Sequence, residues 1–271
     1  MAETWRLLRH GPAAGAINMA IDEAIAAAVA AGKATPTVRF YAWEPPCVSL
    51  GRNQPFAAVD AARCAALGYE IVRRPTGGRA ILHTDELTYS VIAPPDHPLM
   101  AGMILDAYLR IAQGLLAGLR RMGIPAEIAP DTNRAGPDAP AACFEVPSAY
   151  EIVVDGRKLL GSAQNRRTGY VLQHGSLPLI GDVTRLVDCL AFEEEAERAA
   201  QRASLAGHAT TVEKATGRIV TFDEASGALR EGLATALDIE LIPDELSVDE
   251  RARAADLVRE KYGHPSWTER V

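Results

Sequence analysis

Residues 73–83, RRPTGGRAILH, place cations, a glycine pair and a histidine close together. Adjacent glycines let the backbone turn sharply and approach a ligand without a Cβ in the way. Arg74 could hold a carboxylate, a phosphate or an acyl carbonyl beside Gly77 and Gly78. His83 is a candidate for positioning a substrate or for proton transfer. The alternative interpretation is an ordinary hairpin turn whose arginines are solvated.

A second run, GRKLLGSAQ, contains Lys158 followed by Gly161, Ser162 and Ala163. A lysine on a strand, followed by small residues, makes a narrow slot with a cation at its edge. An isolated lysine is more often a plain surface residue, so both interpretations stay open from this motif alone.

A third run, QHGSL, contains His174, Gly175 and Ser176. One histidine in a strand is more often a hydrogen-bonded core residue than a catalyst. His174 is therefore a candidate for positioning or proton transfer only if other motifs lie beside it.

The four cysteines do not have metal-ligand spacing, because no CxxC pair and no nearby histidine accompanies them. No metal site is expected. Cys47, Cys64 and Cys189 fit the pattern of small hydrophobic residues in a core. Cys143 follows the Pro- and Gly-rich residues 130–140 and precedes a predicted strand, a position from which a thiol can be exposed in a cleft.

The composition excludes some classes of partner. The chain has 271 residues, 48% of them hydrophobic, and a formal net charge of −7. A nucleic-acid partner is not indicated, because phosphate backbones bind basic surfaces. No uncharged apolar run reaches the roughly 18 residues of a membrane span, so no membrane partner is expected. With free thiols, the protein is predicted to be cytoplasmic.

Strands are predicted in the middle of the chain and helices around them. Helices are expected at 18–31, 60–67 and 106–122, and strands at 38–43, 47–50, 70–74, 87–92, 149–154, 158–163 and 170–177. After residue 182 the pattern is mainly helical. This order predicts an α+β fold with a mixed, largely antiparallel central sheet flanked by helices. We expect a catalytic domain over residues 1–236, with a helical C-terminal extension, residues 237–271, packed on it.

The order RRPTGGRAILH, GRKLLGSAQ, LQHGSLPL resembles the superfamily of lipoate-protein ligases, biotin ligases and octanoyltransferases, from about Trp5 to the C-terminus. The resemblance implies the catalytic-domain fold of those enzymes, in which the glycine turn and the lysine strand line a tunnel for an acyl chain. It also implies these substrate-binding residues: Arg74, Gly77, Gly78, His83, Gly161, Ser162, Ala163, His174, Gly175 and Ser176.

The run ACFEVPSAYE, residues 142–151, resembles the cysteine-containing octanoyltransferases of this superfamily, which load the H protein of the glycine cleavage system. In those enzymes the matching cysteine is the nucleophile and the matching lysine lowers its pKa. The resemblance thus implies Cys143 and Lys158 as catalytic residues. Lipoate ligases commonly carry a third glycine where this chain has Arg79. An arginine there would crowd an acyl-adenylate and fits a thioester route better.

The resemblance implies transfer of an octanoyl group from octanoyl-acyl carrier protein to a lysine of a lipoyl domain, with no cofactor. Three alternatives stay open. One is an ATP-dependent lipoate-protein ligase, which would not need Cys143. Another is a non-catalytic homologue that binds lipoyl domains. The third is an amidotransferase that moves octanoyl between lipoyl domains. Because both protein partners of an octanoyltransferase are usually acidic, a docking face is predicted around Arg73, Arg74, Arg166 and Arg167. The alternative is that these arginines are only solvated.

Overall fold

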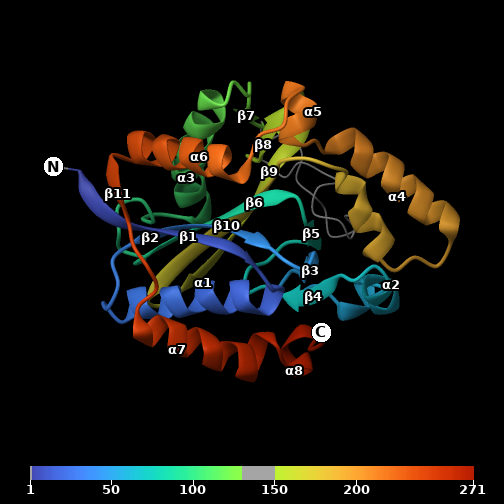
Figure 1. Ribbon diagram of the computed structural model, residues 1–271, viewed down its shortest axis with the longest axis horizontal. Helices are drawn as coiled ribbons and strands as arrows, with labels where there is room; N and C mark the ends of the chain where they lie inside the picture. The colour runs from blue at the N-terminus through green and yellow to red at the C-terminus, as the bar shows by residue number, and fades with distance from the viewer. Residues whose placement is uncertain (1, 130–149) are drawn as a thin grey trace.

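An eight-stranded sheet in the order β11-β1-β2-β6-β10-β9-β8-β7 runs through the centre of the molecule (Figure 1). The computed structural model describes residues 2–129 and 150–271. Only β11–β1 and β1–β2 pair in parallel within this sheet, so the predicted mixed, largely antiparallel sheet is confirmed. The strands are β1 (Glu3–Ala13), β2 (Thr37–Trp43), β6 (Glu86–Ala93), β7 (Glu127–Ile128), β8 (Ile152–Val154), β9 (Arg157–Arg167), β10 (Tyr170–Pro178) and β11 (Ile239–Pro243).

A small second sheet holds the glycine motif. β3 (Cys47–Leu50) pairs in parallel with β4 (Glu70–Arg73) and antiparallel with β5 (Ile81–His83). The turn between β4 and β5 contains Gly77 and Gly78. Gly78 has a φ of +90°, a conformation that glycine adopts without the steric cost of a Cβ. The glycine pair therefore lies in a turn between two strands, as the sequence predicts.

Helices cover both faces of the main sheet. α3 (Ile104–Arg121) and α6 (Phe222–Leu237) pack against each other on one face, and α1 (Gly15–Ala30) lies on the other (Figure 1). The remaining helical segments are η1 (Phe56–Ala58), α2 (Ala61–Ala66), η2 (Val183–Cys189), α4 (Glu195–His208), α5 (Val212–Thr216), α7 (Val248–Leu257), η3 (Val258–Tyr262) and α8 (Pro265–Thr268). Within the described ranges, no helix has the length and apolar character needed to cross a membrane.

The strands alternate between an apolar face and a polar face. On β6, Leu87, Tyr89 and Val91 belong to the main hydrophobic core. Ser90 points the other way and donates a hydrogen bond to Asp22 of α1 at 3.1 Å. Thr88, two residues before it, lies on the same face, because side chains along a strand alternate with a period of two. The α1 face of the sheet is thus the one that offers polar side chains for chemistry.

The C-terminal region contributes to the sheet as well as to the helical layer. β11 pairs in parallel with β1, and Ile239 and Leu241 are buried at this edge. The segment from residue 237, expected to be helical, therefore begins with a strand. α7 then packs on α1. Glu250 of α7 forms a buried ion pair with Arg6 of β1 at 2.5 Å. The last helix, α8, lies against β4.

Candidate active site

The three sequence motifs meet at one cavity of about 110 Å³ between the α1 face of the main sheet and the small sheet. Nine of the ten predicted substrate-binding residues line it: Arg74, Gly78, His83, Gly161, Ser162, Ala163, His174, Gly175 and Ser176. Gly77 is exposed beside it, and its carbonyl accepts a hydrogen bond from Arg74. The cavity is completed by Met19, Tyr41, Trp43, Ser49, Ile81, Thr88 and Glu151, which the sequence motifs did not single out.

The cavity crosses the strands instead of following one of them. Gly161 of β9 is paired with Ser176 of β10, Ser176 with Thr88 of β6, and Thr88 with Tyr41 of β2. These four residues form a row across the sheet, and all four line the cavity. Three strand spacings make the row about 14 Å long. The site is therefore a narrow slot whose shape suits an extended chain.

Lys158, at the start of β9, is fully buried and forms an ion pair with the carboxylate of Glu151, which lines the cavity. A buried charge is costly unless it is paired, so this lysine is built into the interior and is not a solvated surface residue. The plain surface interpretation of Lys158 is wrong. Glu151 is the last residue of the ACFEVPSAYE run, but no sequence pattern indicates that it contacts the lysine. Cys143 lies outside the described residues.

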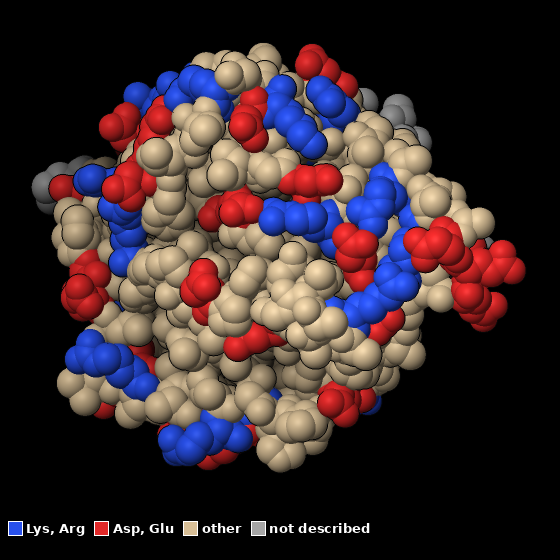
Figure 2. Space-filling model, turned by 45° about the vertical axis from the view of Figure 1, so that its right-hand side comes forward, with Lys and Arg blue, Asp and Glu red and all other residues tan. Residues whose placement is uncertain are grey.

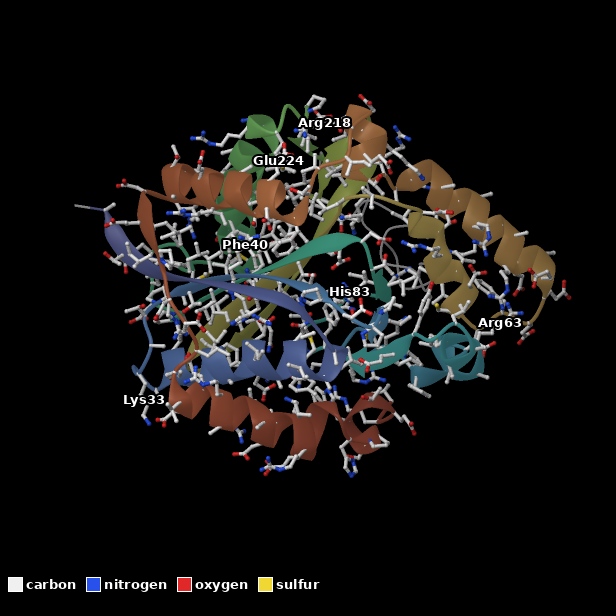
Figure 3. All side chains as sticks on the ribbon, in the orientation of Figure 1. Lys33, Phe40, Arg63, His83, Arg218 and Glu224 are labelled. Carbon is white, nitrogen blue, oxygen red and sulfur yellow. The ribbon has the colours of Figure 1, made fainter. Side chains whose placement is uncertain are left out.

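His83 is hydrogen-bonded at both ring nitrogens. Nδ1 lies 2.7 Å from Oε1 of Glu86, and Nε2 lies 2.8 Å from Oγ of Ser49. The indole of Trp43 stacks on the imidazole, with ring centroids 3.9 Å apart and planes 8° from parallel. Figure 3 shows His83 in the interior of the molecule, whereas Lys33 and Arg63 lie at its periphery. These contacts leave the ring one orientation within the site.

The carboxylate of Glu86 is the charged partner in this group. Its oxygens accept from Thr88 and, at 2.5 Å, from Ser176, besides the imidazole of His83. Burial raises the pKa of Glu86, but His83 and the two hydroxyl donors outweigh burial, and the pKa lies below its ordinary value. Glu86 is therefore ionised at neutral pH, and Nδ1 of His83 donates to it.

His174 belongs to a second buried cluster, which ties the sheet to the glycine turn. Its Nε2 lies 2.6 Å from Oγ1 of Thr76, and its Nδ1 lies 3.7 Å from Oδ2 of Asp22. Asp22 also accepts from Arg39 at 2.7 Å and from Tyr41 at 2.9 Å. Burial lowers the pKa of His174 more than Asp22 raises it, so the imidazole is neutral at pH 7.

Asp22 carries the negative charge of that cluster. Burial raises its pKa, but the guanidinium of Arg39 and the imidazole of His174 outweigh burial and hold the pKa below its ordinary value. None of the sequence motifs includes Asp22, so the sequence analysis missed this group. A charged residue on the buried side of an otherwise apolar helix was the available signal.

The guanidinium of Arg74 stabilises the glycine turn through hydrogen bonds to backbone carbonyls. Its guanidinium donates to the carbonyl of Ser49 at 2.8 Å, of Gly77 at 2.8 Å and of Arg79 at 2.7 Å. Arg74 is only 3% exposed, so the alternative of solvated arginines in an ordinary hairpin is wrong for this residue. Four carbonyl and hydroxyl oxygens around one cation fix the turn that borders the slot.

The predicted docking face is wrong for two of its four members. Arg73 and Arg74 are buried, and Arg166 uses its guanidinium to bind the carbonyls of Met100, Gly102 and Met103. Arg167 is exposed. On the face in Figure 2, lysine and arginine side chains are interspersed with acidic ones and do not form a separate basic patch. The described residues contain no group of three or more His, Cys, Asp or Glu that could hold a metal ion.

Comparisons with known proteins agree with this architecture. Residues 14–234 match the model of the lipoyl protein ligase A/B catalytic domain. Curated octanoyltransferases LipM are similar over almost the whole chain. The protein from Carboxydothermus hydrogenoformans is 42% identical, with 98% of each chain covered, and that from Moorella thermoacetica is 45% identical, with 99% of each covered. The protein from Bacillus subtilis is 40% identical, with 98% of each covered.

Solved structures share the fold. A bi-partite lipoate protein ligase of Thermoplasma acidophilum superposes with a TM-score of 0.82 at 24% identity, covering 98% of this chain and 96% of that one. A lipoate-protein ligase A bound with ATP gives 0.81 at 24% identity, with 99% of each chain covered. The predicted ligase-like catalytic fold is confirmed. The chain belongs to the lipoyl protein ligase A/B catalytic domain family and, within that family, groups with the octanoyltransferases.

Proposed function

We propose that the protein carries an octanoyl group from acyl carrier protein, through a thioester on Cys143, to a lysine of a lipoyl domain such as the glycine cleavage H protein. The protein is thereby an octanoyltransferase of lipoate biosynthesis. The observation that carries the mechanism is the buried Lys158–Glu151 pair, whose Glu151 lines a slot suited to an acyl chain. The similarity to octanoyltransferases LipM over nearly the whole chain supports octanoyl as the group transferred.

The reaction has two acyl transfers. In the first, the Cys143 thiolate attacks the donor thioester carbonyl and a new C–S bond forms. The C–S bond to the carrier breaks, and the carrier leaves as a thiolate that takes up a proton. In the second, the neutral amine of the acceptor lysine attacks the enzyme thioester, an amide forms, and Cys143 leaves as thiolate while the amine loses a proton. The donor is already activated as a thioester, so no ATP is consumed.

Lys158 would supply the electrostatic part of this chemistry. A free thiol has a pKa of about 8.5, so only a few per cent is thiolate at neutral pH. An ammonium nearby favours the thiolate, and each unit by which the thiol pKa falls is worth about 1.4 kcal/mol. Glu151, which lines the cavity, holds the side chain of Lys158 in an ion pair. Lys158 and Cys143 are therefore proposed as the catalytic pair.

The slot would bind the acyl chain. Burying the roughly six methylenes of an octanoyl tail is worth about 5 kcal/mol at ~0.8 kcal/mol each. We assign this role to the residues that border the slot, namely Arg74, Gly77, Gly78, His83, Gly161, Ser162, Ala163, His174, Gly175 and Ser176. Their proximity supports the assignment, since each lines the cavity or, for Gly77, flanks it.

We also propose a division of the chain into a catalytic domain, residues 1–236, and a C-terminal extension, residues 237–271. The match of residues 14–234 to the family model supports this boundary. The reaction is assigned to the cytoplasm because Cys47, Cys64 and Cys189 are free thiols, as in a reducing compartment.

A transfer assay tests the proposed function. Purified protein is mixed with octanoyl-acyl carrier protein and unmodified H protein, with and without ATP, and the mass of the H protein is followed. We expect octanoylated H protein without ATP, and none with Cys143→Ser or Lys158→Met. Modification that requires free octanoate and ATP, and that survives Cys143→Ser, would establish a ligase and overturn the thioester mechanism.

A further inference from the structure

Arg73, the last residue of β4, is fully buried and forms no ion pair within the described residues. Its Nε donates to the carbonyl of Thr268 at 2.9 Å, and its Nη1 donates to the carbonyls of Gly51 at 2.8 Å and Gln54 at 2.6 Å. In the part of the chain that the structure describes, this cation is thus neutralised by backbone dipoles and not by a carboxylate. It connects the C-terminal tail to the loop after β3.

The C-terminal tail, residues 267–271, forms further hydrogen bonds with β4 and with the loop after β3. The indole Nε1 of Trp267 donates to the carbonyl of Arg73 at 2.8 Å. Arg270 donates to the carbonyl of Arg52 at 2.7 Å, and the amide of Phe56 donates to the carbonyl of Val271 at 2.7 Å. Arg270 also lies over the Trp267 ring, 4.0 Å from its centroid. Together with the hydrogen bond from Arg73 to Thr268, the three hydrogen bonds of Trp267, Arg270 and Val271 hold residues 267–271 on β4 and on the loop 51–56.

The loop 51–56 in turn supports the glycine turn. A Cβ built on Gly51 would lie 1.8 Å from the carbonyl oxygen of Gly78, so the two backbones are in direct contact. The amide of Arg52 donates to the carbonyl of Thr76 at 2.8 Å. The hydroxyl of Thr76 is hydrogen-bonded to His174, and Gly78 lines the cavity. A shift of the loop would therefore move the wall of the slot.

We propose that residues 267–271 are a positioning element for the glycine turn, acting on the slot through Arg73 and the loop 51–56 without touching the ligand. This inference rests on the proposed function in one respect, namely that the slot takes the octanoyl chain. It assigns a role to the C-terminal tail in binding the acyl group, beyond packing on the catalytic domain. Loosening the tail should weaken acyl binding more than it slows the chemical steps.

The test compares two conservative variants of the full chain. Trp267→Phe keeps an aromatic ring for Arg270 but removes the donor to Arg73. Tyr262→Phe is the matched control: it removes a hydrogen bond from Tyr262 to Glu23 of α1 in the same C-terminal region, and that bond does not involve Arg73 or the loop. Octanoate binding is measured by calorimetry, and KM and kcat are measured with octanoyl-acyl carrier protein.

We expect Trp267→Phe to raise the octanoate Kd and the donor KM about fivefold, the effect of one lost hydrogen bond, with kcat changed less than about twofold. Tyr262→Phe should leave all three values near wild type. Trp267→Ala should have a larger effect of the same kind. If it fails to fold, the Trp267→Phe result still decides.

Two results would overturn the inference: equal Kd and KM values for the two Phe variants, or a wild-type protein that does not bind octanoate. A wild-type protein that binds octanoate but transfers nothing would instead overturn the proposed function. In that case the Kd comparison between the variants would still test the role of the tail.

Discussion

The side chain of Lys158 is completely buried and its ammonium lies against the carboxylate of Glu151, which is itself 7% exposed. Breaking a buried ion pair by removing one partner is strongly destabilising, because the other charge is left without compensation. Replacing both partners by neutral groups removes that penalty. The pair therefore allows stability and catalysis to be separated experimentally.

We expect Lys158→Met to lower the free energy of unfolding by about 3–5 kcal/mol and to slow octanoyl transfer at least about hundredfold. The double variant Lys158→Met/Glu151→Gln should recover most of the stability and none of the activity. Urea denaturation and the transfer assay measure the two quantities. A double variant that transfers octanoyl at the wild-type rate would remove Lys158 from the mechanism.

Gly175 tests the shape of the slot. A Cβ at this position would lie 2.6 Å from the carbonyl oxygen of Gly161 and 2.6 Å from the ring of Tyr89. We expect Gly175→Ala to cost about 1–3 kcal/mol of stability and to weaken octanoate binding. Gly227→Ala in α6 is the control, because nothing lies within 4 Å of its added Cβ and alanine is the better helix former. Calorimetry that gives both variants the wild-type Kd would contradict the assigned lining.

Asp22 and Arg39 form an ion pair whose two side chains are both 0% exposed. Asp22→Asn should destabilise the protein by about 3–5 kcal/mol, because Arg39 is left buried without its counter-ion. The matched control is Asp223→Asn, which breaks the exposed pair of Asp223 with Arg9 and should cost less than about 1 kcal/mol. Equal losses in urea denaturation at neutral pH would mean that the buried cluster is not the structural element described above.

The lowered pKa of His10 predicts that the folded protein loses stability in mild acid. Burial, followed by the nearby charge of Arg39, lowers its pKa from 6.5 to about 4. Its Nδ1 accepts a hydrogen bond from Arg39 at 2.8 Å, which protonation of that nitrogen would break. Between pH 6.5 and 4 the unfolded chain binds this proton and the folded protein does not, so stability falls as the pH falls through that window.

The contribution of His10 should be about 1–2 kcal/mol, reduced from the full effect of its pKa shift because the side chain is partly exposed. His10→Gln should flatten the stability curve by this amount between pH 6.5 and 4. Other groups, His174 among them, titrate in the same direction in both proteins and cancel in the difference. Urea denaturation at several pH values gives that difference, and a constant value across the window would contradict the prediction.

The motifs of the site could be found from the sequence because each has a local physical cause. The glycine pair indicates a turn between strands, and the small residues after Lys158 indicate a slot. These local patterns identify the residues without any knowledge of their tertiary contacts. The alternation on β6 and β10 likewise indicates strands with one buried apolar face. What links these motifs, however, is the register of the strands: Gly161, Ser176, Thr88 and Tyr41 align only once the sheet is paired.

The remaining site residues depend on partners far away in the sequence. Asp22 meets Arg39 and His174 only when α1 lies on the sheet, and Trp267 meets Arg73 across 194 residues. Arg73 and Arg74 were predicted to belong to a docking face because the protein partners of an octanoyltransferase are usually acidic. They are buried because backbone carbonyls from several segments converge on them, which no local pattern encodes.

The proposed mechanism passes through an octanoyl thioester on Cys143, which an intact-mass measurement detects. The protein is incubated with octanoyl-acyl carrier protein without ATP or an acceptor, and its mass is recorded before and after addition of a lipoyl domain. We predict a gain of one octanoyl group that is absent in Cys143→Ser and is discharged when the lipoyl domain is added. An unchanged mass under conditions that still octanoylate the lipoyl domain, or an adduct retained in Cys143→Ser, would contradict the account.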